Sequence, residues 1–75
     1  MRYFLNVRTS DYLVTDDEGD EFATVEHVLD HAKQVVAELE REYPAETKDE
    51  SAVIPVALEV ADECGTLIFC LPIHP

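Results

Sequence analysis

The feature that most constrains this chain is a single stretch of helical periodicity with alternating sequence on both sides of it. Thr24 stands directly before the stretch, where its hydroxyl can accept a hydrogen bond from the first turn. Pro44 follows and ends the helix, because a proline pushes the preceding residue out of helical geometry. Leu29, Val36 and Leu39 are expected to be buried against a sheet. The pattern predicts one amphipathic helix whose apolar side chains share a face: Val25, Val28, Leu29, Ala32, Val35, Val36, Leu39 and Tyr43.

Alternation between apolar and polar residues indicates strands before and after the helix. Residues 2–8 alternate most clearly, and 12–15, 56–61 and 66–72 form further strand-like runs. Turn-forming residues separate these runs. We therefore expect an α+β fold of ββαββ order: a small, mainly antiparallel four-stranded sheet with one amphipathic helix packed on one face.

Two turns share the same local pattern. Val14–Gly19 and Val60–Gly65 both follow Val-x-Asp-[Asp/Glu]-x-Gly, and each closes a strand. Aspartate side chains hydrogen-bond to the backbone of turns, and glycine tolerates the positive φ that a tight turn needs. We interpret the pair as the same turn chemistry used twice, and not as a repeat architecture.

The chain has 75 residues, which predicts one domain over 1–75 with a small core. A domain of this length buries about 60% of the surface that its unfolded chain exposes, so a monomer has marginal stability. Cys64 and Cys70 show no pattern of a stabilising cross-link, because they form no CxxC pair and no second cysteine cluster accompanies them for a metal site. A dimer interface would add the burial that the monomer lacks.

The charge balance restricts the partners. The chain has 17 acidic against 5 basic residues and a formal net charge of −12. Proteins that bind nucleic acids or anionic membranes do so with basic residues, so neither partner is expected. A basic protein would suit this charge, with the chain acting as an acidic mimic of nucleic acid. Because the first residues lack the apolar run of a signal peptide and no stretch has about 18 apolar residues, we expect a soluble, cytoplasmic protein.

Residues with catalytic potential stand alone in the sequence. Ser10 and Ser51 have no nucleophile signature around them, and neither cysteine has a basic neighbour that would activate its thiol. The sequence therefore predicts no catalytic or cofactor-binding residue and a protein that is not an enzyme. The alternative is a small-ligand or metal-binding protein that uses His27 and His31, four residues apart on the exposed helix face opposite the apolar one. Such a pair lacks the third protein ligand of a catalytic zinc.

The second face of the expected sheet lacks a cover, because one helix covers one side only. Phe4, Ile68 and Cys70 make that face more apolar than a solvated sheet face should be. We expect a homodimer through this face or its strand edge, centred on Phe4 and Ile68. The residues expected to face the helix instead are Tyr3, Leu5, Val7, Val56, Leu58, Val60, Leu67, Phe69 and Leu71.

Residues 2–8, 16–22 and 58–65 together resemble a widespread family of small bacterial proteins of unknown function. Its members begin with an Arg-Tyr-Phe-like strand, carry an Asp-x-Glu-Gly-x-Glu turn before a helix, and end in a Val-x-Asp-Glu-x-Gly hairpin. The resemblance covers nearly the whole chain and implies a bacterial, cytoplasmic protein with no assigned activity. From the charge, the small core and the uncovered sheet face, we expect an acidic, homodimeric interaction or accessory module without catalytic activity.

Overall fold

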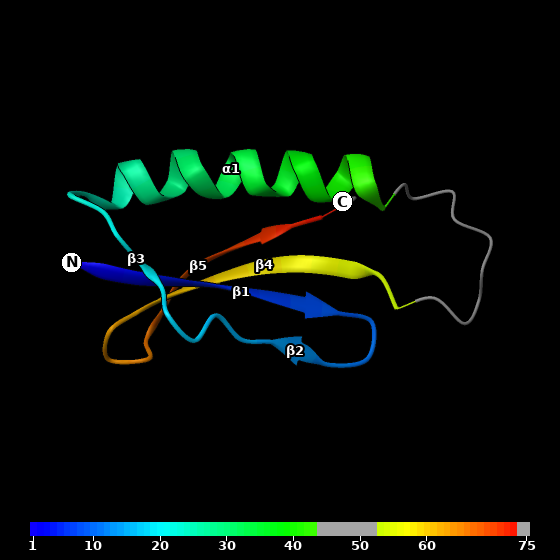
Figure 1. Cartoon of the computed structure of the whole chain (residues 1–75), viewed down its shortest axis with the longest axis horizontal. Coiled ribbons are helices and arrows are strands. Elements are labelled where there is room, and N and C mark those ends of the chain that lie inside the picture. Colours follow the sequence, from blue (N-terminus) through cyan, green and yellow to red (C-terminus); the bar gives the residue numbers. More distant parts are fainter. Residues whose placement is uncertain (44–52, 74–75) are drawn as a thin grey trace.

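The computed structural model describes residues 1–43 and 53–73. They form one long helix and an antiparallel sheet, and the helix lies along one face of that sheet (Figure 1). The predicted α+β class is confirmed. The elements in chain order are β1 (Arg2–Thr9), β2 (Leu13–Val14), β3 (Asp20–Glu21), α1 (Val25–Glu42), β4 (Pro55–Asp62) and β5 (Leu67–Pro72).

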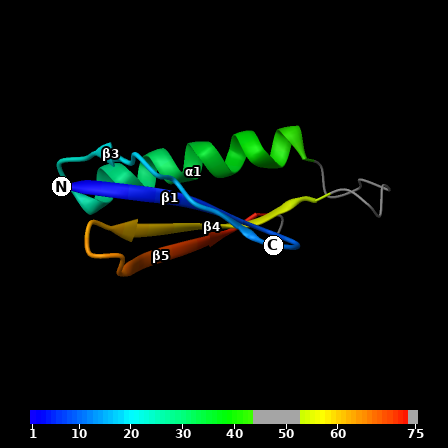
Figure 2. The same ribbon diagram turned by 60° about the horizontal axis from the view of Figure 1, so that its bottom comes forward.

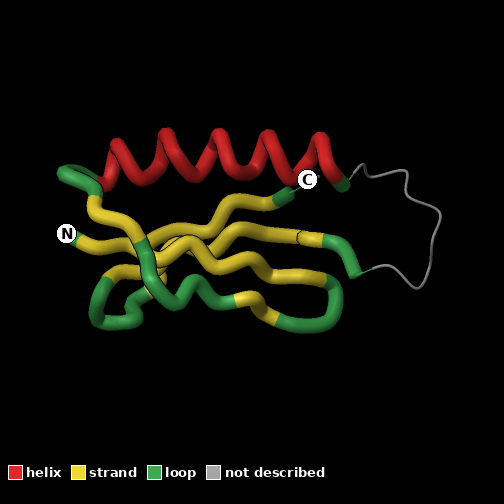
Figure 3. Tube along the Cα trace, in the orientation of Figure 1, coloured by secondary structure: helices red, strands yellow, loops and turns green. Residues whose placement is uncertain are grey.

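The sheet has five strands and not the four expected, because the second strand is interrupted. The strand order is β2-β1-β4-β5, and β3 also pairs with β1. Val14 lies opposite Val7 and Asp20 opposite Tyr3, so β2 and β3 occupy the same edge of β1 (Figure 3). The expected turn after β2 is therefore a bulge between two halves of one edge strand, in which residues 15–19 pass residues 4–6 of β1. The simple ββαββ order is wrong at this point.

Helix α1 begins and ends where the sequence predicts. The Thr24 hydroxyl accepts a hydrogen bond from the backbone N–H of His27 at 3.2 Å. The helix ends at Glu42, and Tyr43 has φ −125° and ψ 76°, as expected for a residue that precedes a proline. No helix in the part of the chain that the structure describes has the length and apolarity to cross a membrane.

The core lies between α1 and the middle of the sheet. Val28 and Ala32 are the buried residues of the helix, and they pack in one cluster with Tyr3, Leu58 and Val60. The predicted helix-facing positions of Tyr3, Leu58 and Val60 are thereby confirmed. Further predicted members pack around this cluster, half-buried: Leu5, Val7, Val35, Val36, Phe69 and Leu71.

The helix presents a narrower buried line than its periodicity predicts. Leu29, Val36 and Leu39 are half-buried, and the expectation that they would be buried is wrong. A single cylinder on a sheet comes closest along one line, here through Val28 and Ala32, and the residues beside that line keep part of their surface exposed.

Two register shifts move residues that alternation assigned to the core. Near the start of β5 the register with β4 slips, so Leu67 lies opposite Ala61 and is 55% exposed. At the start of β4, Pro55 pairs with Thr9 and is buried, whereas Val56 is 38% exposed. Each shift adds a residue to one strand, and an added residue reverses the faces assigned beyond it.

Candidate functional site

Strand β5 forms an edge of the sheet and carries no charged residue. It follows β4 at the end of the strand order, and no further strand among residues 1–43 and 53–73 pairs with it (Figure 2). Its sequence from Leu67 to Pro72 is Leu-Ile-Phe-Cys-Leu-Pro. Edge strands of stable monomers usually carry charges that prevent pairing with another chain. This edge has none, and Ile68 is 36% exposed in addition to Leu67.

The register shows which backbone groups of β5 point outward. The N–H of Ile73 donates to the carbonyl of Val56 at 2.9 Å, so this antiparallel pair is hydrogen-bonded. Hydrogen-bonded and non-hydrogen-bonded pairs alternate along an antiparallel ladder. The pair of Glu59 and Cys70, three residues further along, is therefore non-hydrogen-bonded. The N–H and C=O of Cys70 consequently point away from β4, toward the free side of β5.

The sheet face opposite the helix combines small, apolar and paired polar side chains. Asn6, Glu59 and Cys70 lie in one cross-strand row, and Arg8 lies in the next row on this face, opposite Ala57. The guanidinium Nε of Arg8 donates a short hydrogen bond to Glu59 Oε2. This bond and the charge of Glu59 raise the pKa of Arg8 above its usual value. The opposite charges of Arg8 and Glu59 therefore pair on this face.

The structure separates the three residues predicted to form a dimer face. Ile68 and Cys70 are both exposed on β5. Phe4 lies on β1, with β4 between the two strands, and is half-buried. A Cβ atom placed on Gly19 would lie 2.9 Å from Cδ1 and Cε1 of Phe4, so the bulge backbone covers part of the Phe4 ring. Phe4 is thus partly covered by its own chain, which the alternation pattern did not predict.

The opposite edge of the sheet, formed by β2 and β3, has side chains bonded to its backbone and carries several acidic residues. The Asp16 carboxylate accepts hydrogen bonds from the backbone N–H groups of Leu5 at 3.3 Å and Gly19 at 3.1 Å. The Asp16 N–H donates to Asn6 Oδ1 at 2.8 Å. These bonds replace the ladder where the strand bulges away from β1. The acidic residues of this edge are Asp16, Asp17, Glu18, Asp20 and Glu21.

The repeated Asp-x-x-Gly pattern is confirmed as shared turn chemistry. Asp62 Oδ1 accepts from the N–H groups of Cys64 at 2.9 Å and Thr66 at 3.0 Å, as Asp16 does in its own loop. Gly19 and Gly65 both have positive φ, 69° and 82°. The second loop joins β4 to β5 as a hairpin, whereas the first interrupts an edge strand.

The two histidines do not share one exposed stripe. His27 is exposed, but His31 is half-buried and its ring centroid lies 5.5 Å from that of Phe22. The expectation that both would be exposed opposite the apolar face is therefore wrong for His31. Phe22 reaches α1 from the segment between β3 and the helix, which helical periodicity alone does not reveal. Among the described residues no three histidine, cysteine, aspartate or glutamate side chains come together as a metal-binding group.

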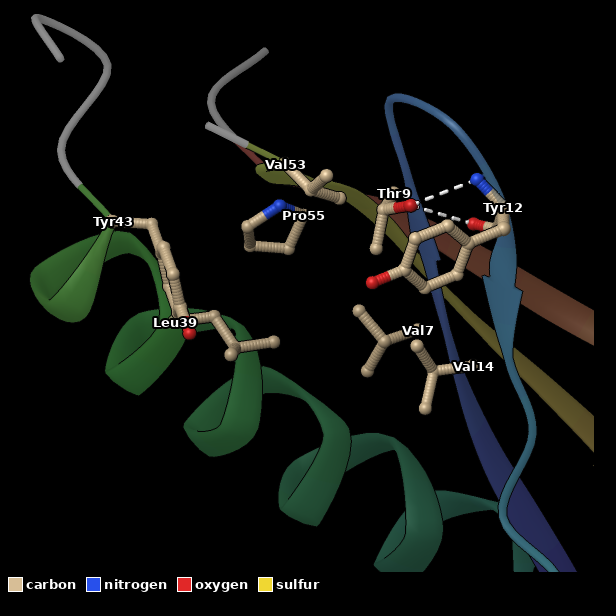
Figure 4. A pocket seen from close by; sticks show the side chains of 8 residues that line it. All are labelled: Val7, Thr9, Tyr12, Val14, Leu39, Tyr43, Val53 and Pro55. Atoms are coloured by element: carbon tan, nitrogen blue, oxygen red, sulfur yellow. Dashed lines mark hydrogen bonds between the residues drawn. The ribbon is translucent and has the colours of Figure 1, made fainter. Parts of the chain in front are cut away.

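A shallow groove of about 240 Å³ opens near the end of α1, between the helix and the β1–β2 hairpin (Figure 4). The Thr9 hydroxyl in its wall donates to the carbonyl of Tyr12 at 2.8 Å and accepts from the Tyr12 N–H at 2.9 Å. The hydroxyl therefore holds the hairpin turn. Sequence reasoning missed this groove because residues distant in sequence line it: Val7, Thr9, Tyr12, Val14, Leu39, Tyr43, Val53 and Pro55.

Comparison with known proteins gives a family for nearly the whole chain. A family described as Domain of unknown function (DUF6894) matches residues 2–74. The chain belongs to this family. The resemblance to a family of unknown function is confirmed at that level. No curated protein and no solved structure matches the chain.

The DUF6894 match includes the first strand, the bulge, the helix and the hairpin of β4 and β5. All the residues considered above therefore lie within the DUF6894 domain. Since the family description assigns no activity, the physical properties of the DUF6894 sheet carry the functional argument.

Proposed function

We propose that this chain is an acidic, self-associating interaction module without catalytic activity, and that its homodimer forms on the uncharged side of the sheet. The observation that carries the proposal is β5: an edge strand of six residues with no charge and with exposed Leu67 and Ile68. The uncovered sheet face continues from this edge. A second copy of the chain that pairs with this edge would bury Leu67 and Ile68.

The distribution of charge supports association on this side. The bulged edge of the sheet carries five acidic side chains, whereas β5 carries none. Association through the bulged edge would bring like charges into contact, which is costly. Association through β5 keeps the acidic edges of two copies apart. The remaining repulsion between two chains of net charge −12 is screened over about 8–10 Å in physiological salt, so the dimer should tighten as salt rises.

The hydrogen-bonded polar side chains support a non-catalytic role. Asp16 and Asp62 bind backbone N–H groups of their own loops, and Asn6 binds the backbone of the bulge. Thr24 caps the helix, and Thr9 holds the hairpin turn. These side chains satisfy the backbone and so support the fold.

Sedimentation equilibrium tests the proposal. The wild-type chain is expected to show twice the 8.5 kDa monomer mass at high micromolar concentration. Its dissociation constant should fall between about 0.05 M and about 0.5 M salt, because the Debye length shortens from over 10 Å to under 5 Å. A mass of 8.5 kDa at high micromolar concentration across the whole salt range would contradict the proposal.

A matched pair of variants locates the interface. Ile68→Glu places a charge on the exposed edge and should give a monomer. Val25→Glu places the same charge on a 45% exposed valine at the start of α1 and should leave the dimer intact. Circular dichroism checks that both variants are folded. Phe4→Glu is less informative, since Phe4 lies against Gly19 and its replacement would disturb the fold.

A further inference from the structure

We infer that two copies of this chain join edge to edge, with β5 pairing antiparallel to β5 of a second copy in a register centred on Cys70. This inference rests on the proposed self-association and adds its geometry. The sheet would then run without interruption from β2 of one copy to β2 of the other. The partner is a second copy, because an antiparallel strand edge is complementary to itself about a two-fold axis.

The backbone of β5 supplies the groups for this pairing. The N–H and C=O of Cys70 point toward the free side of the strand, as the hydrogen bond between Ile73 and Val56 establishes. In a register centred on Cys70, the two copies of this residue exchange two hydrogen bonds. No charged or bulky polar side chain of β5 opposes the approach.

Pro72 and the alternation of the ladder favour this centre over its neighbours. With Cys70 at the centre, Pro72 lies opposite the partner subunit's Ile68, and the carbonyl of Pro72 points to the free side of β5. Proline has no N–H, so no donor of Pro72 is left unpaired. A register centred on Phe69 would instead place at the two-fold axis a residue whose N–H and C=O point toward β4, because Val60 and Phe69 form a hydrogen-bonded pair.

The pairing determines which groups of the two copies lie side by side on each face of the joined sheet. Residues directly opposite each other in a sheet point to the same face, so the two Cys70 thiols become neighbours on the face without helices. Their Cα atoms would be about 5.5 Å apart, as in any hydrogen-bonded antiparallel pair. Both copies of α1 lie on the other face, because a two-fold axis through paired edges is perpendicular to the sheet. Two acidic helices on one face give the pairing its dependence on salt.

Thiol bridging in solution tests the register. Both cysteines are free and exposed, so each is open to reagents. Cys64→Ser leaves Cys70 as the sole cysteine, and Cys70→Ser leaves Cys64 as the matched control. Dibromobimane joins two thiols only when they lie a few ångströms apart. The chain that keeps Cys70 is expected to give a fluorescent covalent dimer, and the chain that keeps Cys64 is expected to remain at monomer mass under denaturing conditions.

A backbone substitution tests the pairing without relying on the thiol. Cys70→Pro removes an N–H that points to the free side, so the monomer should fold, since edge strands tolerate proline at such positions. The proline should abolish the dimer in sedimentation, whereas Cys70→Ser should leave it unchanged. Leu71→Pro serves as the structural control, because Leu71 pairs with Leu58 on the hydrogen-bonded side and its replacement should unfold the chain.

The outcomes separate this inference from the proposed function. A sedimenting dimer that is not bridged through Cys70 and that survives Cys70→Pro would overturn the edge pairing and leave self-association intact. A chain that sediments as a monomer at every concentration would overturn both. Bridging through Cys70 in a chain that Cys70→Pro converts to a folded monomer supports the pairing.

Discussion

The imidazole of His31 lies against the ring of Phe22, with the centroids 5.5 Å apart and the planes inclined by 43°. Phe22 in turn contacts Tyr3 edge-on, with centroids 6.1 Å apart. Tyr3 belongs to the buried core. A histidine that helical periodicity places opposite the apolar face thus joins an aromatic series that leads into the core, and it holds the start of α1 against β1.

This contact predicts that the two histidines differ in their effect on stability. His31→Ala should lower the free energy of unfolding by about 0.5–1.5 kcal/mol, the usual contribution of an aromatic contact. His27→Ala, at an exposed position on the same helix, should change it by less than about 0.5 kcal/mol. Urea denaturation of both variants measures the difference, and equal losses would show that the ring contact adds no stability.

The two glycines of the aspartate turns form a second matched pair. Both have positive φ, so alanine at either position costs about 1–2 kcal/mol of stability. Gly65→Ala meets nothing within 4 Å, whereas a Cβ at Gly19 would lie 2.8 Å from the carbonyl oxygen of Tyr3. Gly19→Ala should therefore destabilise the chain clearly more than Gly65→Ala, as followed by thermal unfolding. The reverse order would mean that the bulge moves away from β1 at little cost.

The Asp16 carboxylate should contribute more to stability than its neighbour. Asp16→Ala leaves the N–H groups of Leu5 and Gly19 without their acceptor, which costs about 1–3 kcal/mol. Asp17→Ala removes a carboxylate that accepts an exposed hydrogen bond from the Thr15 hydroxyl at 3.4 Å, and it should cost less than about 0.5 kcal/mol. Amide exchange at Leu5 gives the specific measurement: it should accelerate in Asp16→Ala and stay unchanged in Asp17→Ala.

Truncations along α1 should follow the buried line of the helix and not the size of the side chain. Val28 is fully buried, so Val28→Ala should cost about 2 kcal/mol. Leu39 is half-buried in the wall of the groove, and Leu39→Ala should cost less although it removes more carbon. Chemical denaturation of both variants measures the order. A larger loss for Leu39→Ala would place the centre of the core nearer the end of the helix.

Local sequence determines the elements of this fold better than their pairing. Thr24 and the proline after Tyr43 delimit α1 by backbone chemistry that acts within one turn, so both ends were predictable. Alternation correctly identified Tyr3, Leu58 and Val60 as core residues because the strands are regular there. It failed at Leu67, where one added residue in β5 shifts the register and no local signal marks the position.

The candidate site was predictable in composition and not in position. The absence of charge from Leu67 to Pro72 is visible in the sequence. That β5 is an edge strand depends on strand order, which long-range pairing decides. The partial covering of Phe4 depends on Gly19 and on a bulge that local pattern presents as a simple turn. Chain segments far apart in sequence create these features, and only the assembled sheet contains them.

The interrupted edge strand sets a limit on the size of any assembly built from this sheet. A sheet with two regular free edges can add copies at both and grow into a filament. Within residues 1–43 and 53–73 the second edge consists of the short strands β2 and β3, and between them Asp16 replaces the ladder with its own carboxylate. Short, bulged and charged edges do not template another strand. A dimer paired through β5, as proposed above, would therefore add no third copy, and the bulge would protect it from open-ended polymerisation.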